Sequence, residues 1–194
     1  IRIMSLQKNV LEAILGSTRT VFNIQSLRML TASTDSQKLS KSLHYYVKEG
    51  KIRNPRRGIY TKATYDEREM ACCLFRPAYI SLEYVLQRFG VVFQYDEAIT
   101  CVSYLNRTVE IDGREYQFRP INPELWIGMD GIERHDNILI ASPERAFLDM
   151  LYLSSGNCYF DNLNSLDKTK VRQLLPISYS AVLSFSPSIL LNGS

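Results

Sequence analysis

The sequence predicts an α+β protein built in two parts, and three observations carry this prediction. Residues 33–62 combine an amphipathic helical pattern with a short basic hairpin, and shorter helical patterns precede them. From about residue 65 onward, helical and strand-like patterns alternate. The predicted domains are residues 1–62 and 63–194. A hydrophobic content of 45% over 194 residues is enough for an apolar core in each of them.

The helical pattern after Ser33 is the most informative segment. Ser33 or Asp35 can cap its start, and Gly50 sits where a glycine commonly ends a helix. At 100° per residue, one side forms an apolar inward stripe of Leu39, Leu43, Tyr46 and Val47. The outward side carries cations, ring side chains, an amide and no acid; it consists of Gln37, Lys38, Lys41, His44, Tyr45 and Lys48.

Two shorter helices are predicted before this one. Residues 5–15 have apolar residues at helical spacing, and Gly16 ends the pattern. Asn23 can cap a second helix over residues 24–30. Residues 31–34 then read as the turn that joins the second helix to the long one.

A basic hairpin follows the long helix. Residues 51–54 and 59–61 predict two short strands joined by residues 55–58. The order of helix, short helix, turn, long helix and hairpin is that of a winged helix-turn-helix, in which the long helix reads bases and the wing holds phosphates. Phosphate contacts are expected from the basic residues around the hairpin, which are Lys51, Arg53, Arg56, Arg57 and Lys62.

The charges are divided unevenly along the chain. Residues 1–62 contain 12 Lys and Arg against 3 Asp and Glu, a net charge of +9. Residues 63–194 contain 11 against 17, a net charge of −6. A basic first domain favours double-stranded DNA as its partner. A membrane surface is not expected, because the outward helix side lacks an apolar flank.

Cysteine usage and hydropathy predict a cytoplasmic protein with no metal site and no cofactor. The four cysteines show no C-x-x-C spacing, and His44 and His135 are the only histidines. Cys72 and Cys73 lie in a helical pattern and are predicted to be buried. No apolar run of about 18 residues and no apolar signal-peptide core is present.

The second domain is predicted as a mixed α/β fold. Asp112-Gly113 gives a strong hairpin signal, and Ser142 with Pro143 gives a strong helix start. Ser81 is taken as the cap of a helix, and Trp126 as a core residue of a strand. The predicted helices cover residues 66–75, 80–89, 142–153 and 168–175, and the predicted strands cover 98–104, 107–111, 114–119, 125–129 and 137–140. The tail, residues 173–194, is uncharged, and no secondary structure is predicted for it from about residue 176 onward.

Three motifs in this order resemble the AbiEi family, the antitoxin and regulator components of type IV (abortive-infection) toxin–antitoxin pairs. They are RGIY at residues 57–60, YISLE at 79–83 and SPERA at 142–146, the last followed by Asp149. The resemblance covers residues 6–153. It implies a winged helix-turn-helix that represses its own operon through inverted repeats. It also implies an antitoxin domain that counters a nucleotidyltransferase toxin, which it need not contact directly.

The same resemblance assigns a role to a group of polar residues. They are expected to line a polar surface used in antitoxicity, formed by Ser81, Glu83, Glu144, Arg145 and Asp149. The spacing alone gives a simpler role to Arg145 and Asp149. Four residues apart on one helix face, they can form an ion pair.

Two other functions compete with the repressor and antitoxin. Asp112, Glu115 and Gln117, with Glu83, loosely resemble the acidic site of a magnesium-dependent nuclease. However, Asp112 belongs to a favoured turn and Glu115 has the alternation of a solvent-facing strand residue, so a solvated hairpin and no enzyme are expected. The remaining alternative is an interaction module whose acidic second domain binds a basic partner.

Overall fold

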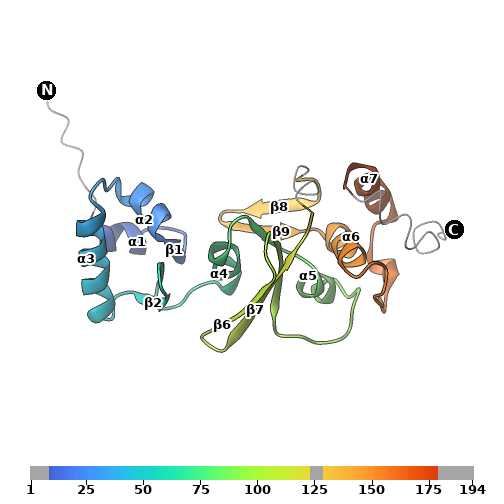
Figure 1. Ribbon diagram of the computed structural model, residues 1–194, viewed down its shortest axis with the longest axis horizontal. Helices are drawn as coiled ribbons and strands as arrows, with labels where there is room; N and C mark the ends of the chain where they lie inside the picture. The colour runs from blue at the N-terminus through green and yellow to red at the C-terminus, as the bar shows by residue number, and fades with distance from the viewer. Residues whose placement is uncertain (1–8, 123–128, 179–194) are drawn as a thin grey trace, which may run out of the picture. The chain divides into compact units, whose positions relative to one another are not determined.

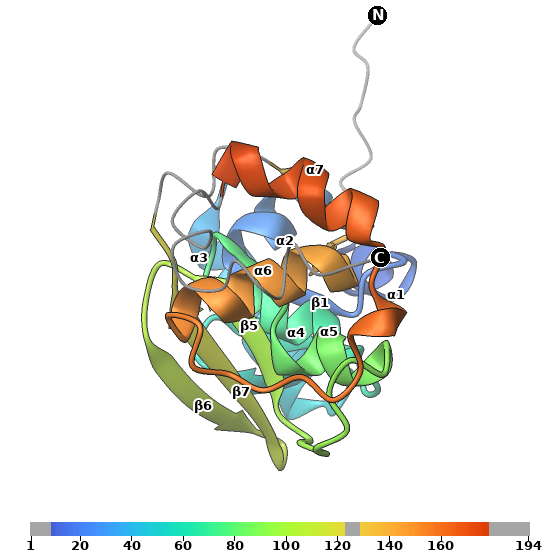
Figure 2. The same cartoon turned by 90° about the vertical axis from the view of Figure 1, so that its right-hand side faces the viewer.

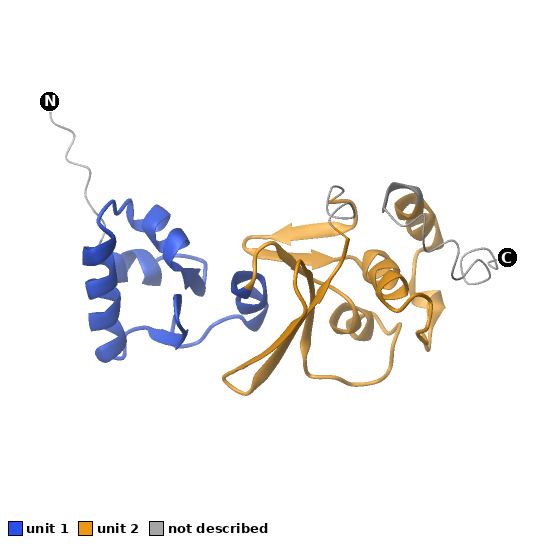
Figure 3. Cartoon of the chain, in the orientation of Figure 1, with its two compact units in different colours: residues 1–74 blue, residues 75–194 orange. Residues whose placement is uncertain are grey.

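A computed structural model describes residues 9–122 and 129–178 (Figure 1). These residues form a mixed α+β protein, as predicted, and their strands make two sheets. The chain divides into two compact units, residues 1–74 (unit 1) and 75–194 (unit 2) (Figure 3). The division lies after the predicted boundary at residue 62, because α4 (Glu67–Leu74) packs against the first strand of unit 1.

Unit 1 combines helices with a three-stranded antiparallel sheet. In chain order, its elements before α4 are α1 (Val10–Leu15), β1 (Val21–Asn23), α2 (Ile24–Thr31), α3 (Ser36–Lys48), β2 (Arg53–Arg56) and β3 (Ile59–Thr61). β3 pairs with β1 on one side and with β2 on the other. The core is an apolar cluster of Ile14, Phe22, Leu27, Leu39, Leu43 and Ile52.

Local capping decides where these helices begin. Asp35 caps α3, since its Oδ1 accepts the backbone N–H groups of Gln37 at 3.0 Å and Lys38 at 3.1 Å. Asn23 caps α2 in a reciprocal capping box with Ser26. Of the first helix, predicted over residues 5–15, the structure shows the part from Val10 onward, and residues 5–8 lie outside the described residues. Asn9 has non-helical dihedral angles and its side chain accepts the N–H of Leu11, so α1 starts at Val10.

The β2–β3 hairpin turns at residues 57–58. Gly58 has φ +81°, a conformation that favours glycine, and a larger residue there would be strained. The Asn54 amide supports the turn by donating to the carbonyls of Arg56 at 2.8 Å and Ile59 at 2.6 Å. β3 has its predicted bounds, whereas β2 runs two residues later than residues 51–54.

A buried carboxylate fastens α4 to β1. Glu69 Oε2 accepts hydrogen bonds from Thr20 N at 2.7 Å, Thr20 Oγ1 at 2.9 Å and Val21 N at 2.9 Å. Glu69 lies in the first turn of α4 and is buried, as are Met70 and Cys73 of the same helix. The helix predicted over residues 66–75 therefore forms, but as part of unit 1.

Unit 2 is built on a six-stranded mixed sheet with the strand order β6-β7-β5-β4-β9-β8. Its strands are β4 (Ala78–Ile80), β5 (Ile99–Ser103), β6 (Arg107–Ile111), β7 (Arg114–Pro120), β8 (Ile132–His135) and β9 (Ile138–Ala141). The pairs β5–β7 and β4–β9 are parallel, and the other pairs are antiparallel. The helices are α5 (Glu83–Arg88), α6 (Pro143–Leu153) and α7 (Lys168–Ser178), with a short 3-10 turn at Leu163–Ser165. α6 packs against both α5 and α7.

Two strong local signals in unit 2 are confirmed. β6 and β7 meet at Asp112 and Gly113, which have φ +52° and +78°. Ser142 caps α6 by accepting the N–H of Arg145 at 3.2 Å, and Pro143 is the first helical residue.

The predicted helix over residues 80–89 is partly wrong. Residues 78–80 form β4, and the helix begins only at Glu83. Ser81 is not its cap, since its hydroxyl donates to Asp149 Oδ2 at 2.6 Å. The N–H of Tyr84 is instead accepted by Thr100 Oγ1 of β5, at 3.0 Å.

Other differences concern β8 and the end of the described chain. β8 was not predicted. α7 was predicted to end before Pro176, but it continues to Ser178. Pro176 lacks a backbone N–H, and so close to the end of the helix this costs a single hydrogen-bond donor. Residues 123–128, which include Trp126 and most of the strand predicted at 125–129, and residues 179–194 of the tail lie outside the described residues.

Across residues 9–122 and 129–178, no helix is long and apolar enough to cross a membrane. The same residues contain no group of His, Cys, Asp and Glu suited to hold a metal ion. All four cysteines are free thiols, and Cys72 and Cys73 are buried as predicted.

Candidate nucleic-acid interface

The outward face of α3 is open to solvent along the helix. All six residues predicted for this face are exposed, and residues 36–48 contain no acidic residue. Exposed Ser40 adds a hydroxyl four residues before His44, which sequence reasoning missed because a serine gives no charge signal. The face therefore presents cations together with amide, imidazole, phenol and hydroxyl groups, the mixture that contacts phosphates and base edges.

Buried contacts fix the opposite side of α3. Leu39 and Leu43 are buried in the unit 1 core, as the inward stripe predicts, and Tyr46 and Val47 are half-buried. The Tyr46 hydroxyl donates to Asn9 Oδ1 at 2.8 Å, which ties the last turns of α3 to the start of α1. The rings of Tyr45 and Tyr46 meet edge to face, with centroids 5.4 Å apart. The helix is thus held in one orientation while its basic face stays exposed.

The capping residue Asp35 places a carboxylate at the start of α3. Lys38 Nζ lies 3.7 Å from Asp35 Oδ2 in an exposed ion pair. The backbone N–H of Lys38 also donates to the Asp35 carboxylate, which lowers the pKa of Asp35 below its usual 3.8. Asp35 is therefore ionised as the cap of α3 at neutral pH.

The β2–β3 hairpin brings a second set of cations to unit 1. Lys51, Arg53 and Arg57 are exposed and Arg56 is half-buried. Arg57 stands in the turn itself, beside Gly58. The Arg53 guanidinium lies 6.0 Å from the centroid of the Tyr65 ring. These residues suit contacts to a phosphate backbone.

Lys62 does not belong to this set. Its ammonium donates to the carbonyls of Ser17 at 2.6 Å and Leu15 at 3.2 Å, where α1 ends. The prediction that Lys62 contacts phosphate is therefore corrected, because its donors are directed to the backbone of its own unit. Its role is to satisfy carbonyls after α1.

The division of charge persists with the structural boundary. Unit 1 contains 13 Lys and Arg against 6 Asp and Glu, a net charge of +7. Unit 2 contains 10 against 14, a net charge of −4. A polyanion would therefore be attracted to unit 1.

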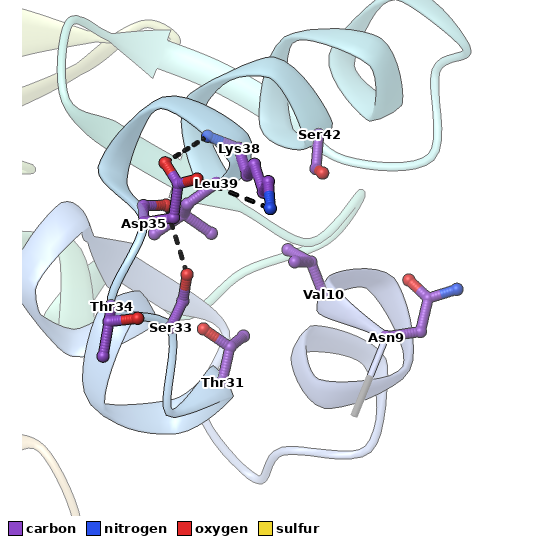
Figure 4. A pocket seen from close by; sticks show the side chains of 9 residues that line it. All are labelled: Asn9, Val10, Thr31, Ser33, Thr34, Asp35, Lys38, Leu39 and Ser42. Carbon is purple, nitrogen blue, oxygen red and sulfur yellow. Dashed lines mark hydrogen bonds and ion pairs between the residues drawn. The ribbon is translucent and has the colours of Figure 1, made fainter. Parts of the chain in front are cut away.

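A polar pocket of about 370 Å³ opens beside the first turns of α3 (Figure 4). Its side chains come from the start of α1, the end of α2, the α2–α3 turn and α3; they are Asn9, Val10, Thr31, Ser33, Thr34, Asp35, Lys38, Leu39 and Ser42. The Thr31 hydroxyl is directed inward, since it donates to Leu27 O at 2.8 Å. The pocket extends the polar surface of the interface next to Lys38.

In unit 2, most of the proposed antitoxin group is buried. Ser81, Glu144, Arg145 and Asp149 are almost completely inaccessible to solvent. The expectation that they line a polar surface is therefore wrong. Glu83 is partly accessible, and its Oε1 lies 2.8 Å from Arg119 Nη2.

These buried residues form an internal polar network. Asp149 accepts hydrogen bonds from Ser81 Oγ at 2.6 Å, the Tyr79 hydroxyl at 3.0 Å and Arg145 Nε at 3.3 Å. The predicted ion pair between Arg145 and Asp149 is thus confirmed. Arg145 Nη1 also donates to Asp130 O at 3.1 Å. Burial and the nearby Asp149 raise the pKa of Tyr79 well above its usual value.

The residues considered for a nuclease site are engaged in local contacts. Asp112 forms the β6–β7 turn with a positive φ. Glu115 is exposed and accepts a hydrogen bond from Gln117 Nε2 at 2.6 Å. Glu83 pairs with Arg119, as described above. Asp112 and Glu115 thus occupy the turn and strand positions of a solvated hairpin, and Glu83 belongs to the first turn of α5.

Comparison with known proteins adds no assignment. The chain matches no protein-family model, and a search of curated proteins finds no match either.

Proposed function

We propose that the chain is a DNA-binding transcriptional repressor in which unit 1 is a winged helix-turn-helix and α3 is the recognition helix. The observation that carries this proposal is the acid-free, fully exposed face of α3. A 13-residue helix of this kind fits the major groove, where its side chains would meet base edges. The partner is double-stranded DNA.

The arrangement of unit 1 supports the same proposal. The order α1-β1-α2-α3-β2-β3 with the sheet order β1-β3-β2 is the one expected of a winged helix. The turn between α2 and α3 is short, with Ala32 in a left-handed conformation at the end of α2. The β2–β3 hairpin would be the wing.

The side chains divide into two roles. Gln37, Lys41 and His44 are exposed on the outward face and would contact base edges. The phosphate contacts would come from the other residues of this face and from the hairpin, namely Lys38, Tyr45, Lys48, Lys51, Arg53, Arg56 and Arg57.

We further propose, from the motif resemblance, that this cytoplasmic repressor is the antitoxin of a type IV toxin–antitoxin pair. It would act on its own operon through inverted repeats. Its functional partner would be a nucleotidyltransferase toxin, without a need for direct contact. In this proposal Ser81, Glu144, Arg145 and Asp149 stabilise unit 2, because their burial removes them from any contact surface. The proposal includes no enzymatic activity and no cofactor.

The base-reading role is tested with Lys41→Ala and His44→Ala. Each should lower the preference for DNA from upstream of the protein's own gene over random duplex, since a good base contact contributes roughly 1–3 kcal/mol of discrimination. The measurement is a competition mobility shift with both duplexes. Lys168→Ala, an exposed lysine of α7, is the matched control and should change nothing. An equal loss of affinity for both duplexes would show that α3 does not read sequence.

The wing is tested with Arg57→Ala. This variant should weaken binding to both duplexes alike and reduce the dependence of log affinity on log salt by about one unit, because one phosphate contact is lost. Fluorescence anisotropy over a salt series measures the slope. An unchanged slope would place Arg57 away from the phosphates.

A further inference from the structure

Four exposed aromatic side chains occupy two neighbouring loops of unit 2. One loop, residues 89–97, joins α5 to β5, and the other, residues 155–162, follows α6. Phe89, Phe93, Tyr95 and Tyr159 are 52%, 68%, 80% and 80% exposed. We call these four residues the aromatic patch. These aromatics lie on two loops that hydrogen bonds hold side by side, and aromatic side chains are enriched in protein interfaces.

Hydrogen bonds hold the two loops together. Asp161 Oδ2 accepts the N–H of Phe93 at 2.8 Å, and Val91 O accepts the N–H groups of Asp161 at 3.0 Å and Asn162 at 3.1 Å. Beneath them, buried Phe160 packs on Phe147 of α6, with ring centroids 4.8 Å apart. Figure 2 shows the connection after α6 crossing the same region as α5 and the loop that follows it. The patch is thus presented on a fixed support, which lowers the entropy cost of binding.

The charges of the two loops are all negative. Neither loop contains a Lys or Arg, and their acids are Asp96, Glu97 and Asp161. The flanking cations are engaged within unit 2. Arg88 stacks on the Tyr84 ring, 3.4 Å from its centroid, and donates to Tyr84 O. Arg114 donates to Glu97 O at 2.8 Å, and its Nη1 lies 3.7 Å from Glu97 Oε2, so one of the three acids already has a cationic partner.

We propose that the aromatic patch binds a basic, arginine-bearing surface of another protein. Guanidinium groups stack on the faces of Phe and Tyr rings, and the surrounding carboxylates select a positive partner. Lysine would gain the charge attraction but little of the stacking. This surface belongs to unit 2 and does not depend on the proposed DNA binding by unit 1, so each can fail without the other.

The test uses the full chain and three labelled peptides of equal length that alternate Gly with Arg, Lys or Ser. Fluorescence anisotropy at physiological salt should show the Arg peptide binding several-fold more tightly than the Lys peptide, and the Ser peptide not binding. The double variant Phe93→Ser with Tyr159→Ser should bind the Arg peptide roughly tenfold more weakly, because two stacking faces are lost. Tyr104→Ser, an exposed tyrosine after β5, is the matched control and should bind normally.

The acidic part is tested separately with Asp96→Asn combined with Glu97→Gln. This variant should bind the Arg peptide and the Lys peptide more weakly by the same factor, since it removes negative charge and leaves the rings in place. Thermal unfolding of every variant, compared with the unchanged chain, checks that the fold is kept; all substituted side chains are exposed.

Three results would overturn the proposal. Equal binding of the Arg and Lys peptides, unaffected by loss of the rings, would show attraction by charge alone. No binding of any peptide would show that the patch does not take basic partners. If the unchanged chain sediments as a dimer and the double variant sediments as a monomer, a second copy of the chain covers the patch.

Discussion

At the scale of single residues, a fully buried ion pair joins Arg145 and Asp149. Both are buried, and the Tyr79 and Ser81 hydroxyls satisfy the remaining acceptor positions of the carboxylate. A buried charge that loses its partner keeps its desolvation cost without the compensating attraction. The pair is therefore far more sensitive to the loss of one member than an exposed pair would be.

Replacement of Arg145 tests this coupling. Arg145→Ala should lower the free energy of unfolding by roughly 3–5 kcal/mol, since Asp149 is left buried and unpaired. Urea denaturation of the full chain, followed by circular dichroism, measures the loss. Arg134→Ala, on the exposed side of β8, should cost far less. Similar losses for the two variants would contradict the importance of burial.

The cap of α3 predicts a pH dependence at the residue scale. The pKa of Asp35 is lower in the folded protein than its usual 3.8, so its stabilising effect is fully present above that value and is lost as pH falls through the folded-state pKa. We expect Asp35→Ala to lower Tm at neutral pH, and the difference from the wild type to shrink in acid. Calorimetry over a pH series measures both.

Asp35→Asn is the control for this prediction. An asparagine keeps a capping oxygen but does not titrate in this range. Its Tm should stay close to that of the wild type at neutral pH. A difference for Asp35→Ala that does not change with pH would exclude the ionised carboxylate as the cap.

At the scale of elements, the packing of α3 depends on its inward stripe. Leu43 is fully buried against Ile14, Phe22 and the rest of the unit 1 core. Leu43→Ala should cost roughly 2–5 kcal/mol, from lost burial and from the cavity that remains. Chemical denaturation monitored by circular dichroism measures this loss. Leu15→Ala, at a position 53% exposed, is the matched control, and an equal effect of both would contradict the assigned stripe.

Elements with local signals were predictable, and elements that depend on distant partners were not. α6 and the β6–β7 hairpin follow from Ser142-Pro143 and Asp112-Gly113, whose geometry is set by neighbouring residues. Ser81 looks like a helix cap, but Asp149, 68 residues away, accepts its hydroxyl. β8 carries Glu133, Arg134 and His135 in succession, and among the described strands its pairing comes from β9.

The same distinction applies to the candidate interface. Helical periodicity was enough to place the outward residues of α3, because exposure there follows from the burial of Leu39 and Leu43. Lys62 could not be assigned in this way. Its partners, the carbonyls of Leu15 and Ser17, are 47 and 45 residues away in sequence. Charge alone does not distinguish a cation that binds a ligand from one that caps a helix.

At the scale of the whole molecule, the two units have opposite net charge, +7 for unit 1 and −4 for unit 2. Phosphate attraction would therefore be confined to unit 1, and unit 2 would remain available for a protein partner. This separation explains how a chain with a net charge of only +3 can hold a strongly basic interface.

The most direct test of the account is the affinity of the full chain for DNA from upstream of its own gene, compared with random duplex, at two salt concentrations. We expect selective binding that weakens steeply with salt. If about six cations of α3 and the hairpin neutralise phosphates, affinity should fall roughly 10³-fold between 50 and 200 mM salt. Weak binding without preference for the upstream DNA would contradict the assignment of α3 as a recognition helix.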